Sequence, residues 1–201
     1  MDCIHSVKYG KHVLSTYHDE DPISPREHCS LGTILYGGSK YILGEQKAEN
    51  TELYNSWDEW HDNELGDDVI SLPVYAYIHS GITISTGPFN CPWDSGQVGY
   101  IYVHKEDVRN IYGVKRISKK LRDNILEALE REIEIYDRYL QGDVYGYMLE
   151  EIYHCECCNN EDTEVIDSCW GFFGYEDMIN TLHMMVPQEH RELVTLIKEV
   201  C

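Results

Sequence analysis

Three cysteines crowd into four consecutive positions of the 201-residue chain, and their types and spacing are those of a metal site. Cys155 and Cys158 form a Cys-x-x-Cys pair, which can place two thiolates on one tetrahedral Zn²⁺. Cysteines this close together do not easily form a disulfide with one another, and the sequence has no secretion signal. We therefore predict a bound Zn²⁺ at this position, with Cys157 and His154 as the local candidates to complete the site.

Other cysteines and histidines give alternatives to a purely local site. Cys3 and His5 are candidate ligands that would arrive from the N-terminus. A second, non-local Zn²⁺ set combines His79, Cys91 and Cys169, together with Asp94 from the same loop as Cys91. Free cysteines can also be buried as small apolar side chains without any metal.

Cys91, His79 and Asp94 also have the side-chain types of a thiol nucleophile, a general base and a group that orients the base. A three-ligand zinc ion at the same place would instead activate water. The sequence has no Gly-rich phosphate loop before a helix, no Gly-x-Ser-x-Gly and no His-Glu-x-x-His. We therefore predict a protein that is not an enzyme, and a metal-dependent or thiol hydrolase is the alternative.

The formal net charge of −20 is unevenly distributed along the chain. Residues 48–104 contain no Lys or Arg, and neither do residues 141–190, whereas Lys and Arg concentrate in residues 105–122. Acidic segments repel nucleic acid and attract basic surfaces, so we predict a protein partner and no direct nucleic-acid binding. Acidity that only keeps the protein in solution is the alternative. The carboxylates expected to be exposed and to bind the partner are Asp58, Glu59, Asp62, Glu64, Glu161, Asp162 and Glu164.

The apolar run of residues 69–103 predicts the centre of the fold. It is typical of a strand, a glycine-containing turn, a loop and a second strand, and it is too apolar for an uncovered hairpin. Residues 118–141 predict the longest helix, which begins at a Ser118 cap and ends before Gly142. Its apolar stripe should lie across the sheet and consists of Leu121, Ile125, Leu129, Ile133, Tyr136 and Leu140.

The C-terminal third predicts a hairpin followed by two helices. Residues 143–154 and 163–170 alternate as strands on either side of the clustered cysteines, and residues 178–185 and 188–200 predict helices separated by Pro187. We therefore predict an α+β fold with a central, mostly antiparallel sheet crossed by a long helix, a Cys-tipped hairpin and C-terminal helices.

Length and composition are those of one domain over residues 1–201, because a chain with 42% hydrophobic residues can bury a real core. No apolar run is long enough to span a membrane, so we expect a soluble, intracellular protein. Residues 45–68 are acidic and place Leu53, Trp57 and Trp60 at roughly helical spacing. A marginal helix needs burial to persist, so these tryptophans are interpreted as core rather than recognition residues.

Several segments are distinctive in their order and spacing. They are Ser24-Pro25-Arg26-Glu27, Leu31-Gly32-Thr33, Leu72-Pro73-Val74-Tyr75, His79-Ser80-Gly81-Ile82-Thr83, residues 91–103 beginning Cys91-Pro92-Trp93-Asp94, and Asp167-Ser168-Cys169-Trp170-Gly171-Phe172. In these segments, which cover most of its length, the chain resembles a family of small phage and prophage proteins of unassigned activity. It departs from that family at His28-Cys29-Ser30, where Trp-Asp-Asn is usual, and at Ser39-Lys40. A partner surface before residue 45 is therefore expected to be particular to this protein.

A prophage-encoded, acidic, cysteine-bearing protein of this size is also similar to anti-CRISPR proteins, and in particular to a zinc-containing inhibitor of type II, single-protein RNA-guided nucleases. The resemblance implies stoichiometric binding to the type II CRISPR effector nuclease of the bacterial host and a block of target-DNA loading. It also implies a structural role for Zn²⁺ and a place in the cytoplasm of the infected or lysogenic host. A phage interaction protein of other function is the alternative.

Overall fold

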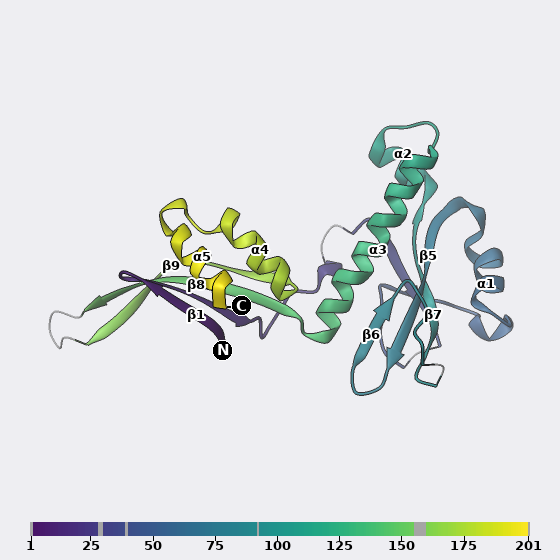
Figure 1. The fold of residues 1–201 in the computed structure, drawn as a ribbon. Coiled ribbons are helices and arrows are strands. Elements are labelled where there is room, and N and C mark those ends of the chain that lie inside the picture. Colours follow the sequence, from purple (N-terminus) through teal and green to yellow (C-terminus); the bar gives the residue numbers. More distant parts are fainter. Residues whose placement is uncertain (1, 28–29, 39, 92, 155–159, 201) are drawn as a thin grey trace. The chain divides into compact units, whose positions relative to one another are not determined.

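The computed structural model describes residues 2–27, 30–38, 40–91, 93–154 and 160–200. The chain divides into two compact units, Ser24–Gln141 and a second made of Met1–Ile23 with Gly142–Cys201 (Figure 1). Each unit has its own sheet, with helices packed against that sheet, and antiparallel pairing dominates both sheets. The predicted α+β class is therefore confirmed.

The sequence predicts a single domain, whereas the structure forms separate hydrophobic cores in the two units. The reason is that the chain builds two sheets, and the helices that cover each sheet come from the same unit. Two compact units can still unfold together, so a single cooperative domain stays a prediction.

Unit Ser24–Gln141 is built on a five-stranded sheet with the order β4-β3-β7-β5-β6. Its strands are β3 (Thr33–Tyr36), β4 (Gln46–Lys47), β5 (Val69–Ile78), β6 (Ile82–Ser85) and β7 (Ser95–His104). The long strands β5 and β7 pair antiparallel at its centre, where the sequence predicts them. Gly99 of β7 approaches the carbonyl oxygen of Leu35 so closely that a Cβ would collide with it. The close pairing of β7 with β3 therefore requires glycine at this position.

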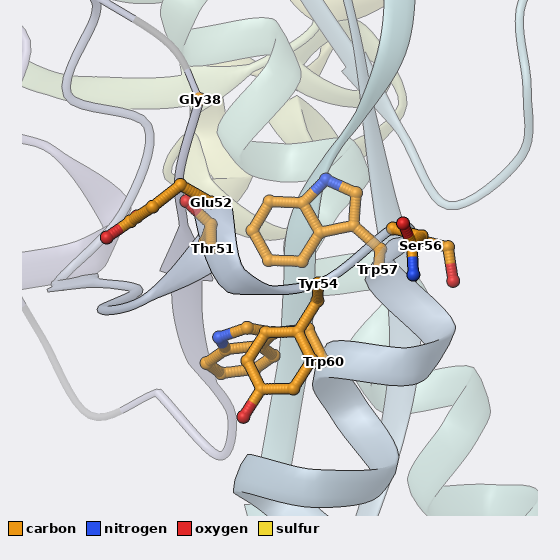
Figure 2. A pocket seen from close by; sticks show the side chains of 8 residues that line it. Gly38, Thr51, Glu52, Tyr54, Ser56, Trp57 and Trp60 are labelled. Carbon is orange, nitrogen blue, oxygen red and sulfur yellow. The ribbon is translucent and has the colours of Figure 1, made fainter.

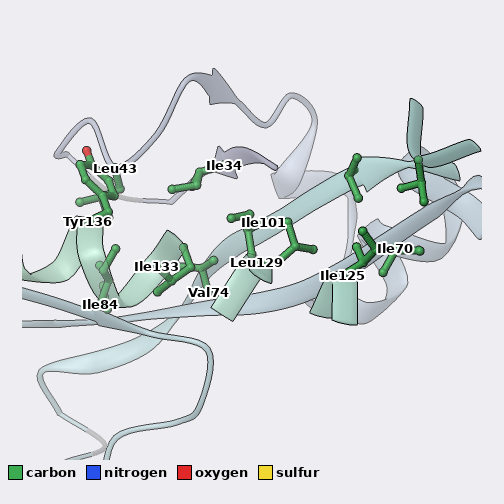
Figure 3. Packing of buried hydrophobic residues seen from close by; sticks show 13 residues of the cluster. Ile34, Leu43, Ile70, Val74, Ile84, Ile101, Ile125, Leu129, Ile133 and Tyr136 are labelled. Carbon is green, nitrogen blue, oxygen red and sulfur yellow. The ribbon is translucent and has the colours of Figure 1, made fainter. Parts of the chain in front are cut away.

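Helix α3 (Lys119–Gln141) lies across one face of this sheet (Figure 1). Ser118 caps it as predicted, because Ser118 Oγ accepts a hydrogen bond from the backbone N–H of Leu121 at 3.2 Å. Ile125, Leu129 and Ile133 are buried against residues of the sheet, as Figure 3 shows. The predicted crossing of the sheet by the long helix is therefore confirmed. A short helix, α2 (Lys105–Tyr112), joins β7 to the residues before α3.

The opposite face of the same sheet is covered by the chain between β4 and β5. Side chains alternate along a strand, and Leu35, Val69 and Tyr102 pack in a separate cluster with Trp60. The covering elements are a 3₁₀ turn (Thr51–Leu53), α1 (Trp57–Trp60), a π-helical turn (His61–Leu65) and a second 3₁₀ turn (Gly66–Asp68). The helix is thus shorter than predicted, and Leu53, expected on its buried face, is 71% exposed.

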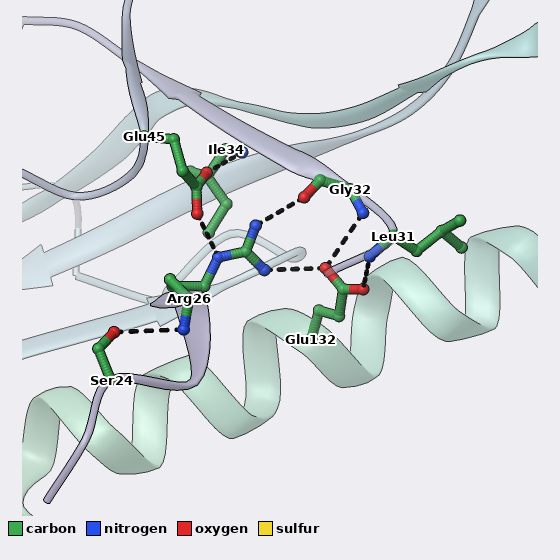
Figure 4. Close-up of polar contacts among 7 residues, drawn as sticks. All are labelled: Ser24, Arg26, Leu31, Gly32, Ile34, Glu45 and Glu132. Atoms are coloured by element: carbon green, nitrogen blue, oxygen red, sulfur yellow. Dashed lines mark hydrogen bonds and ion pairs between the residues drawn. The ribbon is translucent and has the colours of Figure 1, made fainter. Parts of the chain in front are cut away.

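Arg26, with only 8% of its side chain exposed, fastens the segment before β3 to α3 (Figure 4). Its guanidinium donates to Glu45 Oε1 at 2.5 Å, to Glu132 Oε2 at 2.8 Å and to the carbonyl oxygen of Gly32 at 2.6 Å. The Glu132 carboxylate also accepts from the backbone N–H groups of Leu31 and Gly32. Burial acts to lower the pKa of Arg26, but the two carboxylates outweigh it and raise that pKa. The distinctive residues around Arg26 and Gly32 therefore have a structural role.

The second unit has a four-stranded antiparallel sheet with the order β1-β2-β8-β9. Its elements are β1 (Cys3–Tyr9), β2 (His12–His18), β8 (Val144–His154), β9 (Glu161–Phe173), α4 (Tyr175–Met185), a 3₁₀ turn (Gln188–His190) and α5 (Arg191–Val200). The two helices pack on the sheet through Met178, Leu182 and Ile197, which are fully buried. The predicted hairpin and C-terminal helices are confirmed; β8 matches its predicted range to within one residue, and β9 is longer than the sequence predicts.

Buried polar groups in this unit are paired. Tyr147 is 1% exposed, and its hydroxyl donates to Asp167 Oδ2 at 2.7 Å. The fully buried Thr16 hydroxyl lies 3.0 Å from the Tyr175 hydroxyl, which in turn lies 2.7 Å from His5 Nδ1. No buried side-chain nitrogen or oxygen in the described part of the chain lacks a partner. Among the described helices, none has the length and apolar character needed to cross a bilayer.

Candidate functional site

A pocket of about 310 Å³ opens beside α1 (Figure 2). In Figure 2 the rings of Tyr54 and Trp60 lie below that of Trp57, Thr51 lies to one side of them, and the Glu52 side chain extends from the same segment away from the rings. The full lining consists of Gly38, Thr51, Glu52, Tyr54, Asn55, Ser56, Trp57 and Trp60. It therefore combines three aromatic rings with one carboxylate and contains no Lys or Arg.

Short-range hydrogen bonds shape the chain around this pocket. Ser56 caps α1, because its Oγ accepts from the backbone N–H of Glu59 at 3.1 Å. The Glu59 carboxylate in turn accepts from the backbone N–H of Asn55 at 2.9 Å and from its side-chain amide at 3.0 Å. This exchange resembles a capping box. Asn50, at the start of the preceding 3₁₀ turn, is left-handed with φ 56°, a conformation that Asn tolerates better than most residues.

Both tryptophans of α1 are held at their indole nitrogens. Trp57 Nε1 donates to the carbonyl oxygen of Gln97 at 2.9 Å, and Trp60 Nε1 donates to that of Glu49 at 2.8 Å. Their ring centroids are 5.7 Å apart at 67°, the edge-to-face arrangement that aromatic pairs favour. Trp60 is buried, as the core interpretation predicts, whereas Trp57 and Tyr54 are half-buried and also form pocket wall.

Three of the carboxylates predicted to bind a partner here also hold local structure. Glu59 is engaged with Asn55, Asp58 Oδ1 accepts from the Tyr100 hydroxyl at 2.9 Å, and Glu64 Oε1 accepts from the Tyr54 hydroxyl at 2.6 Å. Burial, with a further contribution from Asp58, raises the pKa of Tyr100 to about 12. The hydrogen bond to Glu64 raises the pKa of Tyr54. These phenols therefore stay protonated as donors to the carboxylates at neutral pH.

Two other carboxylates at this surface are not engaged in this way. The Asp62 side chain is 84% exposed, and its ion-pair partner is the imidazole of His61, with Asp62 Oδ1 and His61 Nδ1 3.7 Å apart. Glu52 is exposed and has no hydrogen bond or ion pair to any residue that the structure describes. All four predicted partner-binding residues of this segment are exposed as expected, and the structure adds Glu52 to them.

The second predicted acidic surface lies on β9, an edge strand of the other unit. Glu161, Asp162 and Glu164 are all exposed. Glu161 Oε1 lies 3.5 Å from His154 Nε2, and Asp162 Oδ2 accepts from the Tyr153 hydroxyl at 3.1 Å. Carboxylates along an edge strand also prevent it from pairing with another sheet, so these residues have a structural explanation as well.

The predicted nucleophile, base and orienting group do meet in the structure. Asp94 Oδ2 lies 3.4 Å from His79 Nδ1 and 4.0 Å from Cys91 Sγ. In a thiol relay the imidazole lies between the thiol and the carboxylate, whereas here the carboxylate contacts both other groups. The His79 side chain is 67% exposed, so solvent screens this contact.

The predicted zinc ligands are only partly described. Cys155, Cys157 and Cys158 lie outside the described residues, and His154 is the last residue of β8 before them. In the alternative set, His79 and Cys91 belong to unit Ser24–Gln141, whereas Cys169 belongs to the other unit and packs in its core. Within the described ranges, no group of three or more His, Cys, Asp and Glu side chains could hold a metal ion. Bound zinc therefore stays a prediction.

Of the suggested N-terminal ligands, Cys3 lies exposed on β1, where its thiol donates to the carbonyl oxygen of His5 at 3.4 Å. The His5 imidazole is engaged with the Tyr175 hydroxyl. A zinc ion could therefore be bound by His5 only through its other ring nitrogen, Nε2, while this contact is kept.

Sequence reasoning missed the pocket itself. Its signal was present, because Glu52, Tyr54 and Trp57 place one carboxylate and two aromatic rings within six residues. The spacing predicts one buried helix face. A helix with one buried face does not predict that Tyr54 and Trp57 remain half-exposed. The break into a 3₁₀ turn and a short helix is what opens the wall.

Comparison with known proteins does not assign this chain to a family. No family model matches the chain, and no solved structure matches it. A curated relative, described as a probable serine/threonine-protein kinase of Dictyostelium discoideum, is 28% identical over 109 residues. The match covers 53% of this chain and 13% of that kinase, so the chain spans a small part of its length.

Proposed function

We propose that this protein is an acidic, stoichiometric inhibitor that binds the type II CRISPR effector nuclease of a bacterial host and blocks target-DNA loading. The observation that supports this proposal is the exposure of Asp58, Glu59, Asp62 and Glu64 in a segment without any Lys or Arg. Such a surface is complementary to a basic protein surface.

The nuclease has the matching chemistry. RNA-guided nucleases of this type hold the guide–target heteroduplex in a positively charged channel, which an acidic protein can occupy in place of nucleic acid. Electrostatic complementarity of this kind mainly raises the association rate and makes binding sensitive to salt. The site of action would then be the cytoplasm of the infected or lysogenic host.

A structural Zn²⁺ is part of the same proposal. His154 pairs with Glu161 at the ends of β8 and β9, and only six residues of the sequence, among them Cys155 and Cys158, separate the two. A connection this short allows both thiolates to share one ion, which would stabilise the hairpin. Elemental analysis of protein purified without added metal should find near-stoichiometric zinc, lost in the Cys155→Ser, Cys158→Ser double variant and retained in Cys91→Ser, Cys169→Ser. Absence of zinc would remove this part of the proposal.

The test of function is a titration of the purified host nuclease with this protein, with target-DNA loading and cleavage measured on the same samples. A stoichiometric blocker abolishes both at about equal amounts of the two proteins. Inhibition far below equal amounts would instead indicate an enzyme. If a several-fold excess leaves loading and cleavage unchanged, the proposal is wrong.

A further inference from the structure

We propose that the pocket beside α1 binds the guanidinium group of an arginine side chain presented by a basic protein partner. This inference rests on the proposed function in one respect, since the nuclease would be the partner that supplies the arginine. The occupant is defined by the pocket alone, so the two proposals can fail separately.

The lining provides both interactions that a guanidinium uses. Tyr54, Trp57 and Trp60 supply aromatic rings, and planar guanidinium groups stack on such rings more often than ammonium groups do. Glu52 supplies a carboxylate at the same wall. Tryptophan is the best ring for a cation, and of the two in the lining the half-buried Trp57 is the accessible one, because Trp60 is only 4% exposed.

The Glu52 carboxylate is available for a ligand. It is exposed and has no hydrogen bond or ion pair within the described residues, and residues 48–104 contain no Lys or Arg to neutralise it. Asp62 adds a second largely exposed carboxylate nearby in sequence. Glu52 therefore carries negative charge at this wall without an ion pair to any Lys or Arg that the structure describes.

The pocket is also small and preformed. Its volume of about 310 Å³ is at the lower end of the ~300–1,000 Å³ typical of small-molecule sites, which suits one side chain better than a cofactor. The hydrogen bonds of Trp57 to Gln97 and of Trp60 to Glu49 fix both indoles before any ligand arrives. A preformed wall lowers the entropy cost of binding.

The experiment uses N-acetyl-arginine amide as the probe and follows the indole N–H signals of Trp57 and Trp60 by NMR in the full chain. N-acetyl-citrulline amide is the control ligand, because it has nearly the same shape without the charge. We expect the arginine probe to shift both signals in a saturable way and citrulline to leave them in place. Equal shifts with both ligands, or no shift with arginine, would overturn the inference.

Two matched variants identify the carboxylate. Glu52→Gln should weaken arginine binding about two- to fivefold, which is within the range of one exposed ion pair. Glu49→Gln makes the same charge change three residues away, outside the lining, and should leave the affinity unchanged. Equal weakening by both would indicate a general charge effect and contradict the inference. Tighter binding of tetramethylammonium than of arginine would overturn the assignment to a guanidinium.

Measurements of nuclease binding distinguish a failure of this inference from a failure of the proposed function. If Glu52→Gln and Trp57→Leu, each with an unchanged melting temperature, bind the nuclease as tightly as the natural chain, the nuclease does not fill the pocket, and that part of the inference fails while the function stands. If arginine binds the pocket and the nuclease does not bind the protein, the proposed function fails and the pocket stands.

Discussion

Two sites in the unit Ser24–Gln141 contain acidic side chains. At one of them the chain itself supplies the positive partner, and at the other it does not. At the first, the buried Arg26 guanidinium lies between Glu45 and Glu132 (Figure 4). At the second, the pocket beside α1 presents Glu52 with aromatic rings and no base (Figure 2). The first site is complete within the chain, whereas the second lacks its positive partner.

This difference separates structure from binding. A buried charge without a partner is costly. The Arg26 guanidinium accordingly donates hydrogen bonds to two carboxylates and a backbone carbonyl. An exposed carboxylate costs little, so Glu52 can remain unpaired until a partner supplies a cation. Net charge alone does not distinguish the two cases, and the contacts of each carboxylate do.

The largest effect should come from removing one partner of the buried network. Glu132→Ala leaves Arg26 without one of its carboxylates and also leaves two backbone N–H groups without an acceptor. We expect a loss of about 3–5 kcal/mol in the free energy of unfolding, measured by urea denaturation.

Glu127→Ala on the same helix is the matched control for that change. Its side chain is 60% exposed and pairs with Arg131 one turn away, so its removal should cost no more than about 0.5 kcal/mol. Similar losses in the two variants would show that burial does not distinguish the network from surface pairs.

A smaller effect should distinguish the engaged carboxylates of α1 from the unengaged ones. Asp58→Asn weakens the acceptor of the buried Tyr100 hydroxyl, and we expect a loss of about 1–2 kcal/mol. Asp62→Asn, on an 84% exposed side chain, should stay within about 0.5 kcal/mol of the natural chain. Equal melting temperatures for the two variants would contradict the division of these carboxylates into two kinds.

The last prediction concerns stability at alkaline pH and involves two tyrosines, the buried Tyr100 and the half-buried Tyr145. Burial first, and then hydrogen bonds to carboxylates, raise the pKa of Tyr100 and of Tyr145 to about 12. In the unfolded chain these tyrosines release their protons near pH ~10, so the unfolded state binds fewer protons than the folded state above that value. The contribution of these two phenols to stability should therefore be constant up to about pH 10 and be lost as the pH rises toward 12. The urea midpoint measured across this range tests the sign, and a rise in stability would contradict it.

Much of the fold follows from residue patterns in the sequence. The stripe on α3, the Ser118 cap and the paired strands β5 and β7 depend on local periodicity and capping, and each lies where the pattern predicts it. The division into two units does not follow from local pattern, because β2 pairs with β8 from the far end of the chain and so joins two hairpins into one sheet. Pairing over such a distance has no local signal.

The candidate site was less accessible to sequence reasoning. Exposure of Asp62 and Glu64 could be predicted from polarity alone. The bond from Arg26 to Glu132 joins residues 106 positions apart, and the engagement of Asp58 with Tyr100 joins residues 42 apart. Which carboxylate is balanced internally therefore depends on tertiary contacts, and so does the identity of the unpaired Glu52.

The most direct test of this account compares nuclease affinity at low and at physiological salt for two charge-reversed variants. One variant reverses Glu52 and Asp62, which have few or no internal partners, and the other reverses the exposed Lys115 and Arg116. Both should retain the natural melting temperature. The account predicts that the acidic reversal weakens binding and reduces its salt dependence, while the basic reversal does not weaken it. Unchanged binding after the acidic reversal, or loss of binding after the basic reversal, would contradict it.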